Sequence, residues 1–522
     1  MRFVSSIFFS DCRAYKGVAR SGDGTMADPG RVASGANLLA WLEREGCEHC
    51  VRLGETPGAG GVGVFATRDV ERGEILISCP TRTVISAAET RLDVDPGMKA
   101  FAKALDDVRV ARGDSLSEGT PLDDSTRMQL LLLRERHTPH WSPTDDSQPR
   151  PPPRDGSRTG EDVRFSGYWA AYARSLPGDE LVASLPSSWS EPELERRLGG
   201  TSLFPEVLAE RAELFSLAAA LKRVFFWRGD EEEGEERDFA FARGAFGVEK
   251  LRWARAVFRS RAIALPLAGW GRGGSKTKRS GGDDGALVPL LDMCNHARDA
   301  GTSLERRGAV WRLVATRRFT RDEEVRIDYG GKGNGELLTR HGFVIPNNPF
   351  DTCSYRIGDV SFTLHRGVRE WREFPPGARD AAARFLRQTR GASFLGESTY
   401  DTERASIADS GGGTRRKRAS SPDENERDVI VLTFLAESAR RLSAAIVASP
   451  GESFAESESE SALDASGFAT SSTFLTERAC AMVRESQREL LSDLEDLARE
   501  TIEATRTTTR LLDDATTTKK TR

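Results

Sequence analysis

A short apolar run that ends in polar side chains constrains the fold of this chain more than any other feature. Residues 286–291 read Ala-Leu-Val-Pro-Leu-Leu, and Asp292, Asn295 and His296 follow at once. A run of this length predicts a buried strand, which gathers three hydrogen-bonding side chains at its end. The spacing supplies neither a zinc ligand set nor the nucleophile elbow of a hydrolase. The segment indicates a binding site, with a satisfied core histidine as the alternative.

A glycine-rich segment forms a second candidate. Gly60, Gly61, Val62 and Gly63 precede a short apolar stretch that ends at Ala66. Glycines at a strand edge let a ligand approach the backbone without a Cβ in the way. The spacing is not that of a dinucleotide-binding loop. A tight turn is the alternative interpretation.

A tyrosine at the end of a strand forms the third candidate. Residues 324–330 read Glu-Val-Arg-Ile-Asp-Tyr-Gly. Strand alternation places Val325, Ile327 and Tyr329 on one face. Tyr329 therefore ends a buried row, and an ordinary core tyrosine with a satisfied hydroxyl is the alternative.

The remaining sequence alternates between patterned elements and polar linkers. Hydrophobic periodicity predicts helices at 36–43, 127–136, 168–264 (with breaks), 428–448 and 473–512, and strands at 62–66, 74–79, 310–316 and 324–329. Segments rich in Pro, Gly, Ser or charge predict loops at 142–162, 230–236 and 271–285. We have no functional account of the segment 271–285.

Composition argues against two classes of partner. The chain has 75 Lys+Arg and 80 Asp+Glu, a net charge of −5, whereas nucleic-acid binders usually carry a basic excess. No apolar stretch approaches the length of a membrane span. We therefore expect neither nucleic acid nor a membrane as partner.

The cysteines indicate a reducing compartment. Seven cysteines are scattered along the chain and do not form a disulfide framework. Cys47-Glu48-His49-Cys50 has metal-like spacing, but no second pair lies near it in sequence. We read these two cysteines as ordinary thiols rather than as a zinc site.

The first 25 residues have the composition of an organelle transit peptide. They carry Arg2, Arg13, Lys16 and Arg20 against few acids. Met26 is the alternative start, with the preceding residues an extension. The location therefore stays open between the cytoplasm or nucleus and, alternatively, a plastid.

Taken in chain order, the glycine-rich segment, the Asn-His segment and the tyrosine segment resemble those of the SET-domain protein methyltransferases. The similar branch contains the Rubisco large-subunit lysine methyltransferases and the actin-histidine methyltransferase. Two further motifs match, Tyr168-Trp169-x-x-Tyr172-x-x-x-Leu176-Pro177 and Arg259-Ser260-Arg261-Ala262. The resemblance covers about residues 36–349.

The resemblance implies an α+β fold, a SET-domain β-fold with a helical insertion followed by an all-α C-terminal domain. The expected divisions are a targeting or disordered segment at 1–30, a SET domain at 31–350 with its insertion at about 165–265, and a helical substrate-binding domain at 351–522 with disordered linkers at about 405–428 and 449–472. In the family, the Asn-His segment threads beside the chain that carries the tyrosine, a knot-like arrangement.

The resemblance also implies a site and a cofactor. Tyr329 is implied as the catalytic residue. S-adenosyl-L-methionine is the implied cofactor, and its expected contacts are Gly61, Val62, Gly63, Arg261, Asp292, Asn295, His296 and His341. Ile263 and Leu291 are implied at the substrate pocket. We expect a monomer that acts on a folded, non-histone protein and uses no metal.

Three positions depart from relatives within the branch. His341 stands where plant lysine methyltransferases have a second tyrosine, which leaves the number of methyl groups open. Ile263 and Leu291 stand where the histidine-modifying relative has Asn and Trp. These two positions favour lysine as the target. A protein-histidine methyltransferase and a non-catalytic SET-fold binding module are the alternatives, and the sequence does not name the substrate.

Overall fold

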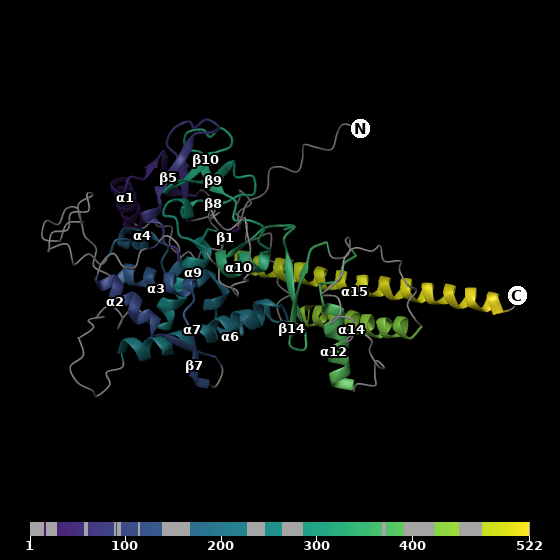
Figure 1. The fold of residues 1–522 in the computed structure, drawn as a ribbon. Helices are drawn as coiled ribbons and strands as arrows, with labels where there is room; N and C mark the ends of the chain where they lie inside the picture. Colours follow the sequence, from purple (N-terminus) through teal and green to yellow (C-terminus); the bar gives the residue numbers. More distant parts are fainter. Residues whose placement is uncertain are drawn as a thin grey trace, which may run out of the picture.

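A computed structural model describes most of the chain. The described residues are 15–16, 29–56, 61–87, 90, 96–112, 115–137, 167–226, 246–263, 285–367, 372–390, 422–447 and 472–520. They form a lobe of strands and helices, from which a helical C-terminal region extends to one side (Figure 1). The loops expected at 142–162 and 230–236, nearly all of 271–285, and most of the segments 1–30, 405–428 and 449–472 lie outside the described residues.

Two small sheets make up the stranded part of the lobe. One has the order β2-β5-β10-β9 and comprises Glu48–His49, Ile75–Pro80, Val310–Ala315 and Thr302–Arg307. The other has the order β3-β4-β11-β8 and comprises Val51–Glu55, Val62–Ala66, Glu324–Ile327 and Asn295–His296. β11 and β8 pair in parallel. The other pairs in both sheets are antiparallel.

The sequence pattern explains the burial of these strands. In β10, Trp311, Leu313 and Ala315 are buried and alternate with half-buried residues, as the two-residue period of a strand requires. β5 lies between β2 and β10 and is buried along nearly its whole length. Their buried side chains therefore anchor the strands in the core of the lobe.

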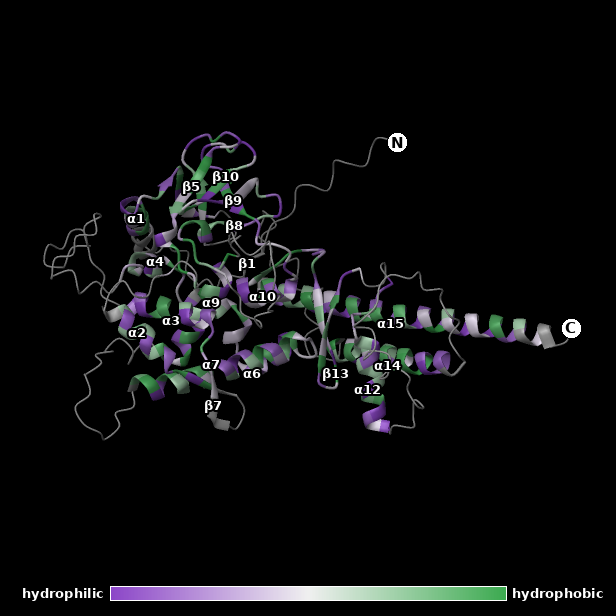
Figure 2. Ribbon diagram, viewed as in Figure 1, coloured by the Kyte–Doolittle hydropathy of each residue, from purple (hydrophilic) through white to green (hydrophobic). Residues whose placement is uncertain are grey.

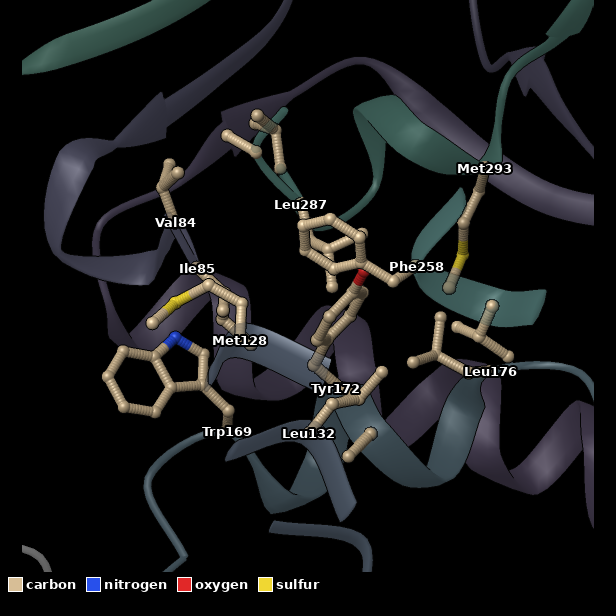
Figure 3. Packing of buried hydrophobic residues seen from close by; sticks show 14 of the residues in the cluster. Val84, Ile85, Met128, Leu132, Trp169, Tyr172, Leu176, Phe258, Leu287 and Met293 are labelled. Atoms are coloured by element: carbon tan, nitrogen blue, oxygen red, sulfur yellow. The ribbon is translucent and has the colours of Figure 1, made fainter. Parts of the chain in front are cut away.

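Helices cover the strands and pack together beneath the segment 285–293. They are α1 (Pro29–Arg44), α2 (Pro96–Asp106), α3 (Asp124–His137), α4 (Ala170–Ser175), α5 (Asp179–Ser184), α6 (Glu191–Leu198), α7 (Leu203–Phe226) and α9 (Val248–Arg261), with 3-10 turns η1 (Thr81–Thr83), η3 (Pro186–Ser188) and η4 (Leu291–Met293). Leu132 of α3, Tyr172 of α4 and Phe258 of α9 meet in one buried cluster (Figure 3). A hairpin of β6 (Arg109–Arg112) and β7 (Ser115–Pro121) lies within this part of the chain.

The C-terminal region has its own core. It follows α10 (Asn334–His341) and β12 (Phe343–Val344), which pairs with β1 (Tyr15–Lys16). The hairpin β13 (Thr352–Ile357) and β14 (Val360–His365) leads into α12 (Ala378–Arg390), α14 (Pro422–Val447) and α15 (Ser472–Lys520). α14 and α15 pack together and carry hydrophobic and hydrophilic residues in alternation along their length (Figure 2). α15 runs on past the end of α14 (Figure 1).

The α+β fold class with a helical C-terminal region is confirmed, with three differences in detail. The buried strand expected over 286–291 is wrong, since that segment makes only isolated bridges at Ala286 and Leu287 before it turns into η4. The hairpin over 352–365 adds strands to a region expected to be helical. α14 begins at Pro422, inside the linker expected at 405–428, so that expectation is wrong for its last residues. Proline is favoured in the first turn of a helix, where its missing N–H is not needed, and the acidic residues after it suit a helix N-terminus.

A buried polar network joins the two regions. Asp351 Oδ1 accepts a hydrogen bond from the backbone N of Asn334 at 2.6 Å, and its Oδ2 accepts one from Ser486 Oγ of α15 at 2.6 Å. Asn348 donates to the carbonyl of Lys332 at 2.8 Å and accepts from Arg298 at 2.8 Å. The network therefore connects α15 with the start of α10.

Two negative findings hold for the described residues. Among the described helices, none combines the length and the apolar character needed to cross a membrane. Within the same part of the chain, no group of three or more His, Cys, Asp or Glu side chains is placed to hold a metal ion. Cys47 and Cys50 therefore have no third ligand there.

Candidate functional site

Parallel pairing of β8 and β11 brings two of the three candidate segments together. Asn295 lies opposite Arg326, and His296 lies opposite Ile327. The backbone N of Ala297 donates to the carbonyl of Ile327 at 3.0 Å. The Asn-His segment and the strand that leads to Tyr329 are therefore adjacent.

Tyr329 is held at both ends by the Asn-His segment. Its backbone N donates to Nδ1 of His296 at 3.1 Å, and its hydroxyl donates to the carbonyl of Cys294 at 2.9 Å. The ring centroids of His296 and His341 lie 5.0 and 4.9 Å from that of Tyr329. His341 is the last residue of α10, which ends there because Gly342 takes a left-handed conformation with φ of 74°.

Burial sets the charge state of these groups. It raises the pKa of the Tyr329 phenol above its ordinary value of 10 and lowers the pKa of His296 below 6.5. His296 is therefore neutral at pH 7, and its Nδ1 is the acceptor while Nε2 carries the proton. Tyr329 is therefore a neutral phenol at pH 7 and donates a hydrogen bond.

The glycine-rich strand lies against the same point. A Cβ at Gly63 would lie 2.9 Å from Oε1 of Glu324 and 3.2 Å from Nδ2 of Asn295. These two atoms are themselves hydrogen-bonded at 2.7 Å. Gly61 has φ of 107°, a conformation that favours glycine, and Val62 between them is 38% exposed. The sequence analysis missed Glu324, whose only signal is an acid at the start of the tyrosine strand.

Asp292 is the most buried charged group of the site. It is 5% exposed, and Tyr172 of α4 donates a hydrogen bond to its Oδ2. Nη1 of Arg261 donates to the backbone carbonyl of Asp292 at 2.8 Å. Burial raises the pKa of Asp292 to about 6, although Arg261 and Tyr172 act in the opposite direction. Tyr172 belongs to the buried cluster of Figure 3, and its hydrogen bond to Asp292 was also not predicted from the sequence.

Two polar atoms at Asp292 and Arg261 have unused hydrogen-bonding capacity. In the part of the chain that the structure describes, Oδ1 of Asp292 and Nε of Arg261 are buried without a hydrogen-bond partner. Buried polar atoms are normally paired, so such atoms call for a ligand or an ordered water. Asp292 and Arg261 therefore bring one acceptor and one donor that the described residues leave unsatisfied.

The two residues expected at the substrate pocket lie in the core below. Ile263 forms an isolated bridge with Ala286, with hydrogen bonds of 2.9 and 3.0 Å, and is half-buried. Leu291 begins η4 and is 0% exposed. The structure thus brings Gly63 against Asn295 and brings His296 and His341 against Tyr329, but it does not bring Leu291 to the surface.

Comparison with known proteins identifies the family. The sequence model of the SET domain matches residues 61–330, more than half of the chain. The chain belongs to the SET-domain family. The matched range begins at Gly61 and ends at Gly330, so it contains all three candidate segments.

The sequence relatives and the solved structures point to the same branch. The actin-histidine N-methyltransferases of Dasypus novemcinctus and Danio rerio are each 26% identical over 304 residues, which cover 57% of this chain and 40% of each relative. The chain therefore matches less than half of the length of these relatives.

Among solved structures, the SET domain of LSMT bound to MeLysine and AdoHcy aligns with a TM-score of 0.58 at 16% identity and covers 92% of this chain and 94% of that one. Rubisco LSMT bound to AdoMet aligns with a TM-score of 0.56 at 16% identity and covers 90% and 93%. At this identity the likeness concerns the fold, and the expected SET fold is confirmed.

Proposed function

We propose that this chain is an S-adenosylmethionine-dependent protein N-methyltransferase that methylates lysine on a folded, non-histone protein. The main support for this proposal is the placement of Tyr329. Its hydroxyl donates to the carbonyl of Cys294 and its backbone N donates to His296, the residue after Asn295, which lies against Gly63. Membership of the SET-domain family and the AdoMet-bound structural neighbour support the proposal.

The cofactor contacts follow from the donor set. Gly61, Val62 and Gly63 would leave room along the backbone, and Asn295 and His296 would supply hydrogen bonds. Arg261 and Asp292 would hold the charged amino-acid end, since each has an unused polar atom. When bound, S-adenosylmethionine supplies a methyl group on a positively charged sulfur, and transfer to nitrogen releases S-adenosylhomocysteine and a proton.

The residues around Tyr329 would prepare the attacking nitrogen. An ordinary lysine with pKa near 10.4 needs about 4.6 kcal/mol to lose its proton at pH 7. The rings of His296, His341 and Phe343 lie around that of Tyr329. A lysine bound against these rings would lose water from around its ammonium group, which would lower that requirement. Tyr329, a neutral phenol, would orient the amine and the methyl donor rather than remove the proton.

Lysine is the proposed target because the two positions that hold Asn and Trp in the histidine-modifying relative are apolar here, and one of them, Leu291, is fully buried. Ile263 and Leu291 offer no hydrogen-bonding side chain to an imidazole. Histidine is the second candidate, since the sequence relatives are named actin-histidine N-methyltransferases. His341 beside Tyr329 sets part of the pocket in either case.

The C-terminal region is proposed to hold the protein substrate. We assign residues 31–350 to the SET domain and 351–522 to a substrate-binding domain, with the chain acting as a monomer. The hairpin β13-β14 and helices α12, α14 and α15 share a core separate from that of the strands, which supports this division.

The test is transfer of labelled methyl groups from S-adenosylmethionine by the purified chain to proteins of a cell extract, with the modified residue mapped by mass spectrometry. We expect a labelled lysine on a discrete protein and a loss of about 100-fold or more in turnover for Tyr329→Phe with cofactor binding retained. Labelled histidine would overturn the lysine assignment. Bound cofactor without transfer would favour a binding module, and absence of cofactor binding would overturn the enzyme proposal.

A further inference from the structure

Two buried cysteines lie in contact on neighbouring strands. The sulfur atoms of Cys47 and Cys79 are 3.4 Å apart, and the residues are 4% and 0% exposed. In the β2-β5 pair, Glu48 lies opposite Ser78 and His49 lies opposite Ile77. The same register places Cys47 opposite Cys79. Directly opposed residues of antiparallel strands have Cα atoms about 4.5–5.5 Å apart, which is within the range that a disulfide spans.

Cys50, the other cysteine of the Cys47-Glu48-His49-Cys50 motif, takes no part in this contact. Cys50 lies on the other side of the strand, is half-buried, and places its sulfur 3.7 Å from the carbonyl of Leu76. Strand alternation explains the separation, since residues three apart point to opposite faces. The Cys47-x-x-Cys50 motif therefore provides one member of a thiol pair, and the partner comes from β5.

We propose that Cys47 and Cys79 are a modification site that forms a reversible disulfide when the protein meets a hydroperoxide. One thiol sulfur attacks the peroxide O–O bond, which releases water and leaves a sulfenic acid. The other thiol sulfur then attacks the sulfenic sulfur and displaces a second water. Both sulfurs are oxidised, one molecule of hydrogen peroxide is reduced to two of water, and an external dithiol reverses the change.

The position of the pair in the sheet gives the oxidant a route. β2 is the edge strand of its sheet and contains only Glu48 and His49, and Cys47 directly precedes it, so local opening of this edge would expose Cys47 while the β5-β10 pair stays formed. Contact with Cys47 and burial both raise the pKa of Cys79, which disfavours its reactive thiolate. The disulfide should therefore form more slowly than at an exposed thiol.

Oxidation of Cys47 and Cys79 would change a contact with the segment 289–296, which carries Asp292, Asn295 and His296. The effect on cofactor binding rests on the proposed function. The Cys79 thiol donates to the carbonyl of Pro289 at 3.4 Å. Pro289 precedes Leu290, which has φ of 74°, a strained conformation for a leucine, and Asp292 follows two residues later. A disulfide has no S–H to donate, so Pro289 would lose this contact beneath the turn that positions Asp292.

The experiment treats the full chain with hydrogen peroxide, blocks remaining thiols with iodoacetamide, and identifies cross-linked peptides by mass spectrometry. Binding of S-adenosylmethionine is measured by calorimetry before oxidation, after it, and after dithiothreitol. We expect a Cys47–Cys79 peptide and a loss of about fivefold in affinity that dithiothreitol restores. The control Cys50→Ser should keep both effects, and Cys47→Ser should abolish both.

The outcomes separate this proposal from the proposed function. A Cys47–Cys50 peptide, or no internal cross-link in the wild-type chain, overturns the pairing whatever the cofactor does. A Cys47–Cys79 peptide with unchanged affinity overturns the link to the cofactor segment. If the reduced chain does not bind S-adenosylmethionine, the proposed function fails, and the cross-linked peptide still decides the pairing.

Discussion

Two aspartates with nearly the same burial have opposite surroundings in the two regions of the molecule. Asp351, where the lobes meet, is 3% exposed, and Asp292, in the candidate site, is 5% exposed. The oxygens of Asp351 accept from Asn334 and Ser486, and Arg366 lies 3.6 Å away. Asp292 accepts from Tyr172, and its Oδ1 has no partner among the described residues.

The difference separates a carboxylate that stabilises the fold, Asp351, from one that lowers its stability, Asp292. Burying a charge is unfavourable unless hydrogen bonds replace its hydration. Asp351 has that replacement from both regions. Asp292 has it in part, and burial raises its pKa from 3.8 to about 6. Unsatisfied groups of this kind are expected at functional sites, where a ligand completes the set.

The largest expected effect is that of Asp351→Ala, which should destabilise the protein by about 3–5 kcal/mol. The change leaves the Asn334 N–H and the Ser486 hydroxyl without their acceptor and removes one of the two carboxylates that pair with Arg366, which keeps Glu489. Urea unfolding followed by fluorescence measures it. Asp359→Ala, an exposed aspartate in the β13-β14 turn, is the matched control and should change stability by less than about 0.5 kcal/mol. Equal effects of the two variants would remove the contrast.

Asp292→Asn should act in the opposite direction and stabilise the cofactor-free protein at pH 7 by up to about 3 kcal/mol. The raised pKa means that the folded state resists ionisation of Asp292. Ionisation of Asp292 therefore lowers the stability of the wild-type protein. This destabilisation is absent below pH 3.8, grows as pH rises, and is complete above about pH 6.

The stability difference between Asp292→Asn and wild type should therefore widen between pH 4 and 6, as measured by thermal unfolding across that range. Cofactor affinity should fall in the same variant. A variant that is less stable than wild type at pH 7 would contradict the view that Asp292 costs stability.

Tyr172→Phe should destabilise the protein by about 2 kcal/mol at pH 7 and by about 1 kcal/mol at pH 5. The phenol donates to Asp292, and a hydrogen bond to a charged acceptor contributes more than one to a neutral acceptor. Adding the same change to Asp292→Asn tests the coupling in a double-mutant cycle. A cost independent of pH and of residue 292 would mean that Tyr172 serves only to pack the core.

The smallest expected effect is that of Ser486→Ala, about 1 kcal/mol, because Asp351 keeps its other donors. Cofactor affinity should not change in this variant, because Ser486 contacts Asp351 and not Asp292. Calorimetry with S-adenosylmethionine measures it. A large loss of affinity would show that the two regions are coupled through α10.

Local patterns predicted the elements better than they predicted the contacts. The strand at 62–66 and the helix at 127–136 could be read from hydrophobic periodicity, which depends on neighbouring residues. The alternation over 352–357 and the Gly358-Asp359 turn also marked a hairpin, but the helical pattern assumed for the region hid it.

The pairings within the site could not be read from local patterns. Tyr172 and Asp292 lie 120 residues apart, and Asn295 and Glu324 lie 29 apart. The family motifs contain Tyr172 and Asp292 but do not predict the hydrogen bond between them. The thiol pair of Cys47 and Cys79 depends on strand register, which sequence leaves open until the sheet order is known.

The network at Asp351 also governs how the protein can be divided. A cut after residue 350 follows the boundary that the sequence suggests, yet it removes the carboxylate that accepts the first N–H of α10. The same helix ends at His341, against the ring of Tyr329. A catalytic fragment for structural or biochemical work should therefore extend through the β13-β14 hairpin. It should also include α15, because Ser486 of that helix donates to the same Asp351 carboxylate that accepts from α10.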